Sequence, residues 1–235
     1  MVPMDQQATT VEPMPQDWRI QVVDLPAALP DQVRAAIDRH WASVTAAGRP
    51  YWNGPALAIA QETKSDSQWR VELHRTDYAH YLATLHRQID APYWCRVVAV
   101  GGLLITADGQ AVLGENAPET VNAGELHCIG GGIEVGHADQ SGLIDPQACM
   151  AAELREETGL ALDQSAVGHW QLRWLVTEGP WGFRFPLYAV HLTVTTAALA
   201  DFFETFNEGL RAAGRAPEIF RLVAVPADSQ AVERF

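Results

Sequence analysis

The stretch Gly130–Leu160, GGGIEVGHADQSGLIDPQACMAAELREETGL, carries most of the chemical information in this sequence. Its glycines follow directly on a predicted strand, Leu126 to Ile129. Asp145 and Pro146 predict the start of a helix, because aspartate is a favoured N-cap and proline a favoured first helical residue. Gly159 predicts the end of that helix. The expected order is therefore strand, glycine turn, polar loop and helix.

Three carboxylates lie on one face of this predicted helix. Glu153, Glu156 and Glu157 stand at positions i, i+3 and i+4, which project from the same side of an α-helix. Like charges at this spacing destabilise an exposed helix by about 0.2–0.5 kcal/mol per pair. A divalent cation is the simplest compensation, and an all-oxygen ligand set suits Mg²⁺ or Mn²⁺ rather than Zn²⁺. The alternative is an acidic helix face that only contacts solvent.

The glycines and the helix together resemble the Nudix box, GX5EX7REUXEEXGU, where U is a bulky aliphatic residue. Gly131 corresponds to the first glycine, Glu153-Leu154 to the EU pair, Glu156-Glu157 to the EE pair and Gly159-Leu160 to the closing GU. The resemblance implies an α/β protein, specifically the Nudix α/β/α sandwich. It also implies hydrolysis of a pyrophosphate bond in a nucleoside diphosphate linked to another moiety.

The resemblance assigns roles to individual residues. Glu153, Glu156 and Glu157 would ligate Mg²⁺ or Mn²⁺, with the carbonyl of Gly130 as a further ligand. Such ions neutralise the pyrophosphate and lower the pKa of the attacking water. A general base is also needed, and the candidates are Glu157 and Glu218, the second of which precedes the last predicted strand. For Glu218, an ordinary loop carboxylate is the competing interpretation.

The sequence departs from the box at three points. His137 stands where the box has a glutamate, and Ala152 where it has an arginine. Arg155 does not replace that arginine, because residues two apart on a helix face different directions. Between His137 and Ala152 lie 14 residues where the box has 7, so the loop carries an insertion of seven.

One Nudix branch, which hydrolyses UDP-glucose and UDP-galactose, is similar in these irregularities and carries an N-terminal α+β extension. The stretch Trp69–Thr84 resembles the strand and helix that precede the catalytic domain in that branch. This resemblance implies a UDP-sugar as substrate, with a nucleoside monophosphate and a sugar phosphate as products. Two alternatives remain: hydrolysis of another nucleotide (ADP-ribose, a dinucleotide or an oxidised nucleotide), and a Nudix protein that binds nucleotides without cleaving them.

The pattern of elements predicts a small N-terminal α+β extension with a loose tail at residues 1–90 and a Nudix domain at residues 91–235. In the extension we expect a short strand at 19–24, a helix from Asp31, and two strands around residues 55–60 and 69–74, followed by a short helix at 78–86. In the second part we expect strands at 97–106, 110–113, 171–177, 184–194 and 219–225, and a helix at 196–213.

Composition limits the classes of protein. The 235-residue chain is 48% hydrophobic and 19% charged, and its formal charge is −13. A basic face for nucleic-acid phosphates is therefore not expected, and neither is a membrane span, since the longest apolar run is too short. Three cysteines without CxxC spacing argue against a disulfide framework or a structural zinc site. We expect a cytoplasmic protein, and the Nudix resemblance adds a small-molecule nucleotide substrate and a homodimer as further expectations.

Two aromatic side chains leave alternatives open. His127, on the strand that enters the glycines, either lines the site or packs beneath it. Trp181 alternates with Phe183 and Phe185, a pattern typical of a core-facing strand. Because Trp181 lies near a turn, stacking on a nucleobase is the alternative.

Overall fold

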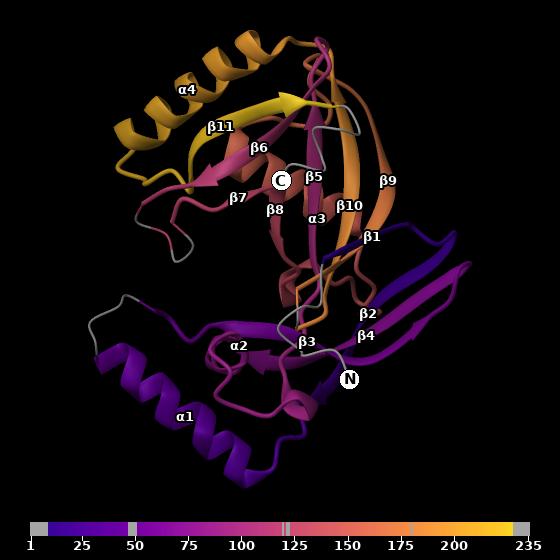
Figure 1. Ribbon diagram of the computed structural model, residues 1–235, viewed down its shortest axis with the longest axis vertical. Helices are drawn as coiled ribbons and strands as arrows, with labels where there is room; N and C mark the ends of the chain where they lie inside the picture. The colour runs from indigo at the N-terminus through magenta and orange to yellow at the C-terminus, as the bar shows by residue number, and fades with distance from the viewer. Residues whose placement is uncertain (1–8, 47–50, 119, 121–122, 180, 228–235) are drawn as a thin grey trace. The chain divides into compact units, whose positions relative to one another are not determined.

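The computed structural model describes residues 9–46, 51–118, 120, 123–179 and 181–227 (Figure 1). Helices and a mixed sheet are both present, so the prediction of an α/β protein is confirmed. Backbone contacts divide the chain into two units. Unit 1 comprises Met1–Ala99, Gly132–Pro146 and Leu175–Phe185, and unit 2 comprises Val100–Gly131, Gln147–Trp174 and Pro186–Phe235. The predicted boundary near residue 90 stays a prediction.

Unit 1 contains a three-stranded sheet and two helices. Its elements are β1 (Thr10–Pro13), β2 (Asp17–Pro26), α1 (Asp31–Ala46), β3 (Pro55–Lys64), β4 (Gln68–Asp77), α2 (Tyr78–Leu85), η2 (Ala91–Tyr93) and η3 (Val135–His137). The sheet has the order β2-β4-β3, with β2 parallel and β3 antiparallel to β4. The N-terminal region is therefore α+β, as the sequence predicts, although Thr10–Pro13 forms a strand where a loose tail was expected.

A small apolar core joins the two helices of unit 1. Val33 and Ile37 of α1 are buried together with Ala79 and Ala83 of α2 and with Ile89. The spacing of the α1 residues is the helical repeat that predicts this helix from the sequence. At the start of α2, the Asp77 side chain accepts a hydrogen bond from the His80 backbone N–H at 2.9 Å. This N-cap explains why α2 begins at Tyr78.

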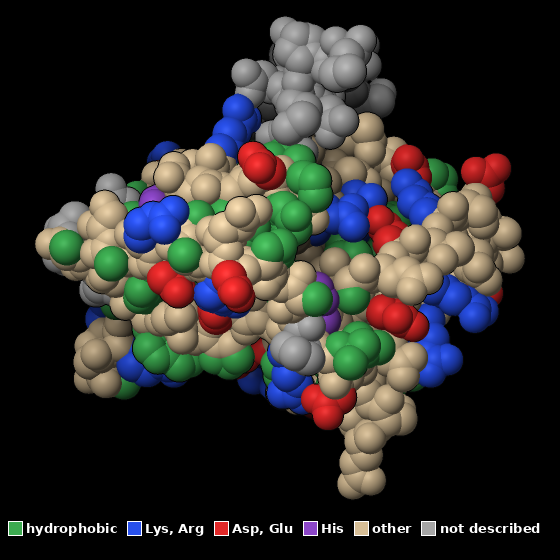
Figure 2. Space-filling model, turned by 90° about the horizontal axis from the view of Figure 1, so that it is seen from below, with side chains coloured by type: hydrophobic (Ala, Val, Ile, Leu, Met, Phe, Trp, Pro, Cys, Tyr) green, Lys and Arg blue, Asp and Glu red, His purple; other side chains and the backbone are tan. Residues whose placement is uncertain are grey.

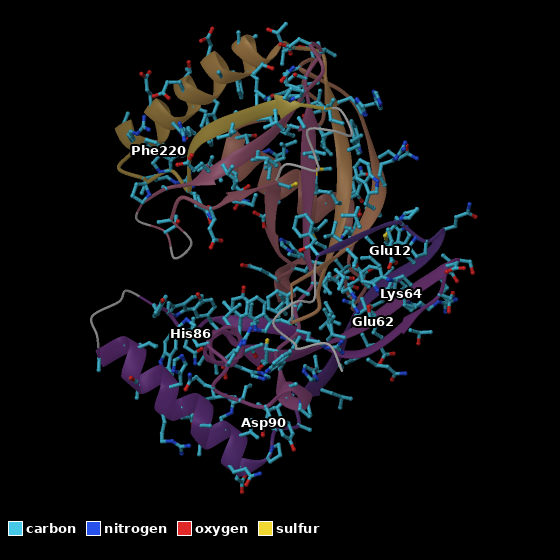
Figure 3. All side chains as sticks on the ribbon, in the orientation of Figure 1. Glu12, Glu62, Lys64, His86, Asp90 and Phe220 are labelled. Carbon is cyan, nitrogen blue, oxygen red and sulfur yellow. The ribbon has the colours of Figure 1, made fainter. Side chains whose placement is uncertain are left out.

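Unit 1 also contains a buried ion pair between β3 and β10. The Arg184 guanidinium donates to both carboxylate oxygens of Glu62, at 2.6 and 2.8 Å, and the Trp69 indole N–H donates to Glu62 Oε1 at 2.9 Å. The two charged side chains are only 13% and 11% exposed. Glu62, labelled in Figure 3, is therefore a fully compensated buried carboxylate.

Unit 2 is built on the larger sheet. Its elements are β5 (Ala99–Ile105), β6 (Gln110–Asn116), β7 (Leu126–His127), β8 (Ile129–Gly132), α3 (Pro146–Thr158), β9 (Val167–Glu178), β10 (Phe183–Leu192), α4 (Thr196–Ala212) and β11 (Ile219–Pro226). The strands follow the order β9-β10-β5-β6-β11, with β7 beside β6 and β8 beside β5. β10 is parallel to β5, whereas β6 pairs antiparallel with both β5 and β11.

Helix α3 packs closely on the central strands of this sheet. The position that a Cβ atom would take on Gly102 of β5 lies 2.9 Å from a Val190 methyl carbon and 3.7 Å from the Met150 sulfur. Met150 and Leu154 of α3 are fully buried. The buried face of α3 therefore fixes the direction in which its glutamates project.

Two further findings concern the surface. On the face shown in Figure 2, Lys and Arg side chains are interspersed with Asp and Glu, so basic charge is not gathered into one stripe there. Among the described residues, no helix is both long and apolar enough to cross a membrane.

Candidate active site

The predicted acidic helix is present with the bounds that its end signals indicate. α3 begins at Pro146 and ends at Thr158, next to Gly159. Its three glutamates differ in environment: Glu153 is half-buried, Glu156 is exposed and Glu157 is only 5% exposed. The carboxylates are therefore not an ordinary solvated acidic face, because one of them has been removed from water.

Glu157 reaches from α3 to the glycines of β8. Its Oε2 accepts a hydrogen bond from the Gly130 backbone N–H at 2.9 Å. This contact links the two ends of the box, which are far apart in the sequence. The contact involves the N–H of Gly130 and not its carbonyl, so the role of that carbonyl as a metal ligand stays a prediction.

The environment of Glu157 opposes its ionisation. Burial and the negative charge of Glu153 raise the pKa of Glu157 to about 8, with smaller contributions from Glu218 and Glu156, while the Gly130 hydrogen bond acts in the opposite direction. Among the described residues, the charges that act on this carboxylate are thus all negative, like its own. A buried carboxylate in such surroundings either holds a proton or requires a cation.

Glu218 joins this group from another part of the chain. It immediately precedes β11 and is exposed to solvent. The Ala117 backbone N–H donates to the Glu218 carbonyl at 2.8 Å, which ties this residue to the end of β6. Its carboxylate is close enough to raise the pKa of Glu157. The structure therefore brings both candidate bases to the same cluster.

The glycines lie within strand β8, where the sequence predicted a turn. The reason is the close approach of β8 to β5: a Cβ atom on Gly130 would collide with the backbone carbonyl of Val100. A Cβ atom on Gly131 would lie 2.5 Å from Glu153 Oε1. Glycine is therefore needed at these positions to let a neighbouring strand and a carboxylate approach the backbone.

The carboxylates do not converge as a ready-made metal site. Among the described residues, no group of three or more His, Cys, Asp or Glu side chains is placed to hold a metal ion. The chemistry of the donor set nevertheless fits a hard cation, since the charges of three carboxylates act on the buried carboxylate of Glu157. The metal-ligand assignment for Glu153, Glu156 and Glu157 stays a prediction.

The residues that depart from the Nudix box have local roles. His137 ends the short helix η3, and its Nδ1 accepts a hydrogen bond from the Glu134 backbone N–H at 3.1 Å. Ala152 is half-buried on α3. Neither residue supplies a charge to the cluster around Glu157, whose electrostatic neighbours are glutamates.

The lengthened box loop is held by the N-terminal strand β2, all within unit 1. The Ile144 backbone N–H donates to the Ile20 carbonyl at 3.0 Å, and the Val22 N–H donates to the Gly142 carbonyl at 2.7 Å. The Gln21 side chain adds a bond to the Ser141 carbonyl at 3.2 Å. The insertion therefore forms ladder-like contacts with β2, an arrangement that sequence reasoning missed because no local pattern signals it.

His127 and Trp181 both make internal contacts. The His127 ring nitrogens lie 2.9 Å from Asn116 Oδ1 and 2.7 Å from the Cys128 carbonyl oxygen. The Trp181 indole N–H donates to the Thr84 carbonyl at 3.1 Å, and its ring stacks on Phe183 with centroids 5.7 Å apart. Both residues therefore support the local structure.

Solved structures similar to this chain include Nudix hydrolases. One, from Nitrosomonas europaea, has a TM-score of 0.34 and 15% identity, with coverage of 59% of this chain and 78% of that chain. Another, from M. smegmatis, has a TM-score of 0.31 and 16% identity, with coverage of 58% and 80%. A MutT protein from Methanosarcina mazei Go1 has a TM-score of 0.26 and 16% identity, with coverage of 48% and 94%. No protein-family model and no curated protein matches the chain.

Proposed function

We propose that this chain is a Nudix-type pyrophosphohydrolase that uses Mg²⁺ or Mn²⁺ to cleave a nucleoside diphosphate linked to a second moiety. One observation carries the proposal: the buried carboxylate of Glu157 lies at the glycines of β8, among the charges of Glu153, Glu156 and Glu218. Such a cluster is unfavourable unless a proton or a cation joins it. The resemblance of residues 130–160 to the Nudix box supplies the reaction that this centre would serve.

The donor set is suited to a hard divalent ion. Glu153, Glu156 and Glu157, with the Gly130 carbonyl, would hold it, because oxygen ligands are those that Mg²⁺ prefers. When bound, the ion would neutralise the pyrophosphate and lower the pKa of the attacking water. The binding of a cation would also relieve the repulsion that raises the pKa of Glu157.

The two candidate bases differ in burial, and this difference suits them to different roles. Glu157 is buried and hydrogen-bonded to Gly130, which suits a carboxylate held in a fixed ligand position. Glu218 is exposed, which suits a group that meets water. In this assignment Glu218 accepts a proton from the water whose oxygen attacks phosphorus. The bond between the attacked phosphorus and the bridging oxygen then breaks, and this oxygen leaves with the other phosphoryl group. The products are a nucleoside monophosphate and the phosphate ester of the second moiety.

A UDP-sugar is the substrate that we propose first. The support is the resemblance of Trp69–Thr84, now β4 and α2 of the N-terminal α+β region, to the corresponding part of the UDP-sugar branch. The lengthened box loop, which contacts β2, is a second feature in common. The products would be UMP and a sugar phosphate.

A hydrolysis panel with Mg²⁺ tests the function. UDP-glucose, UDP-galactose, ADP-ribose, GDP-mannose, a dinucleoside polyphosphate and nucleoside triphosphates would be incubated with the protein, and the products resolved by chromatography. Release of UMP and a sugar phosphate from the UDP-sugars alone supports the first proposal. Faster hydrolysis of another compound than of the UDP-sugars identifies a different Nudix substrate.

A nucleotide-binding protein without hydrolytic activity is the second candidate, because Ala152 and His137 replace two residues of the box. In that case no compound of the panel is hydrolysed. Nucleotide and Mg²⁺ would still raise the melting temperature, since a ligand that binds only the folded state stabilises it. Hydrolysis therefore distinguishes the enzyme from the nucleotide-binding protein, and both measurements use the same protein preparation.

A further inference from the structure

A hollow in unit 2 lies beside the segment that carries Glu218. It has a volume of about 390 Å³ and is formed by the end of β6, the end of α4 and the residues that lead into β11. We name it the Phe220 hollow. Its lining residues are Ala117, Pro118, Arg211, Ala216, Pro217 and Phe220.

The lining is apolar except for one cation. Phe220 is 49% exposed, and Figure 3 places it beside the connection between α4 and β11. Two prolines and two alanines contribute small rigid surfaces around it. Arg211 donates one hydrogen bond to Glu204 at 3.3 Å, and a guanidinium group carries five N–H donors in all. The hollow therefore offers an aromatic face together with a cationic donor.

The hollow adjoins the chain segment that carries Glu218, one of the two candidate bases. Pro217 and Phe220 line the hollow, whereas the carboxylate of Glu218 between them acts on Glu157. The hydrogen bond from Ala117, another lining residue, to the Glu218 carbonyl at 2.8 Å fixes this arrangement. The hollow and Glu218 therefore share one short segment of unit 2.

We propose that the Phe220 hollow binds the planar base of the nucleotide substrate, an inference that rests on the proposed function and adds a base-binding site to it. Stacking on Phe220 suits a heteroaromatic ring, because every nucleobase has a π face. Arg211 can donate to a carbonyl oxygen of the base or to the sugar. The volume of about 390 Å³ lies in the range of small-molecule sites.

The test compares ligands with and without a base. Affinities for UMP, AMP and ribose 5-phosphate would be measured in the presence of Mg²⁺ by isothermal titration calorimetry or ligand-observed NMR. The variants are Phe220→Ala, Phe220→Trp and Phe202→Ala. Phe202 is a matched control, since it is a partly exposed phenylalanine of α4 that does not line the hollow.

The expected result is that Phe220→Ala weakens UMP or AMP binding about tenfold or more, as the loss of one base–aromatic stack implies. Ribose 5-phosphate binding should be unchanged, Phe220→Trp should restore nucleotide affinity, and Phe202→Ala should behave like the wild type. Equal affinity of Phe220→Ala and wild type for the nucleotides would overturn the inference. Equal weakening of all three ligands would overturn it too, and so would the absence of nucleotide binding in the wild type.

Kinetics distinguish this inference from the proposed function. If the wild type hydrolyses a nucleotide and Phe220→Ala leaves its KM unchanged, the function stands and the base-binding site is wrong. If no nucleotide is hydrolysed but Phe220→Ala selectively loses affinity for UMP or AMP, the site stands and the hydrolytic function is wrong.

Discussion

Two buried glutamates in this protein have opposite environments. Glu62 in unit 1 is held by both arms of the Arg184 guanidinium and by the Trp69 indole N–H. Glu157 in unit 2 accepts a backbone hydrogen bond from Gly130 and otherwise faces negative charge. The first carboxylate has the partners that a structural ion pair needs. Among the described residues, the charges that act on the second carboxylate are all negative.

The pKa values of the two groups differ accordingly. For Glu62, burial alone would raise the pKa, but the hydrogen bonds from Arg184 and Trp69 and the positive charges of Arg184 and Arg96 hold it below its ordinary value. For Glu157, burial and the charge of Glu153 raise the pKa to about 8. Strongly perturbed carboxylates without compensation are typical of functional sites. Glu62 thus has the environment of a structural ion pair, and the raised pKa of Glu157 supports the proposal that this carboxylate serves chemistry.

The largest expected effect is on stability, from removing the Glu62 side chain. Glu62→Ala leaves the Arg184 guanidinium, 13% exposed, without its carboxylate, and breaking a buried pair in this way costs about 3–5 kcal/mol. Chemical denaturation would measure the loss. Arg70→Ala is the matched control, because its pair with Asp17 is 52% exposed on both sides and is worth below about 1 kcal/mol. If Glu62→Ala lowers the free energy of unfolding no more than Arg70→Ala does, Glu62 is not a stabilising residue of a buried ion pair.

For Glu157 the expected loss is in activity. Glu157→Gln should lower kcat/KM for the hydrolysed nucleotide by about a hundredfold or more, because a proposed metal ligand loses its charge while the shape of the side chain is kept. Glu208→Gln, an exposed change on α4, should leave the rate within about twofold. Steady-state kinetics with Mg²⁺ measures both. Wild-type turnover in Glu157→Gln would contradict the assignment of this cluster as the catalytic centre.

The metal-free protein should lose stability as the pH rises. Because the folded pKa of Glu157, about 8, lies above the unfolded value of 4.5, the folded state binds the extra proton between these two values. With respect to this group, stability is therefore highest at and below pH 4.5 and declines as the pH rises toward 8. Unfolding in EDTA, measured from pH 6.5 to 9, should show a decline of roughly 2 kcal/mol that Glu157→Gln reduces. Identical pH profiles of the two proteins would show that Glu157 ionises normally.

The smallest effect is expected at the glycines. Gly131→Ala places a methyl group against the Glu153 carboxylate, whereas a Cβ atom on the neighbouring Gly132 would meet nothing within 4 Å. Displacement of Glu153 should lower the hydrolysis rate about tenfold, as expected when one charged group of a site is misplaced. Gly132→Ala should stay within about twofold of the wild type. If the two substitutions have equal effects, the position of Glu153 does not matter for the reaction.

Much of the local structure could be predicted from the sequence. Asp145-Pro146 and Gly159 give the ends of α3, because helix termini depend on a few residues with well-known preferences. The i, i+3, i+4 spacing identifies the acidic face of that helix. Glu218 could be named as a candidate because it precedes the last strand, although only the structure shows its charge acting on Glu157.

The features that escaped prediction all depend on contacts between distant residues. Nothing near Glu62 in the sequence indicates that Arg184 neutralises it. The pairing of the box loop with Ile20 and Val22 of β2 is equally invisible, since a loop that joins a strand carries no repeat of its own. The extended conformation of the glycines follows from the approach of Gly130 to Val100 on β5, which is a property of the sheet.

The central claim is that the Glu157 cluster binds a divalent cation in exchange for a proton. Calorimetric titration with Mg²⁺ at pH 7, in buffers of different ionisation enthalpy, counts the protons released on binding. Because the pKa of Glu157 is raised to about 8, we predict the release of close to one proton per protein, and none from Glu157→Gln. Binding of Mg²⁺ by the wild type without proton release, or the absence of binding at millimolar Mg²⁺, would contradict the claim.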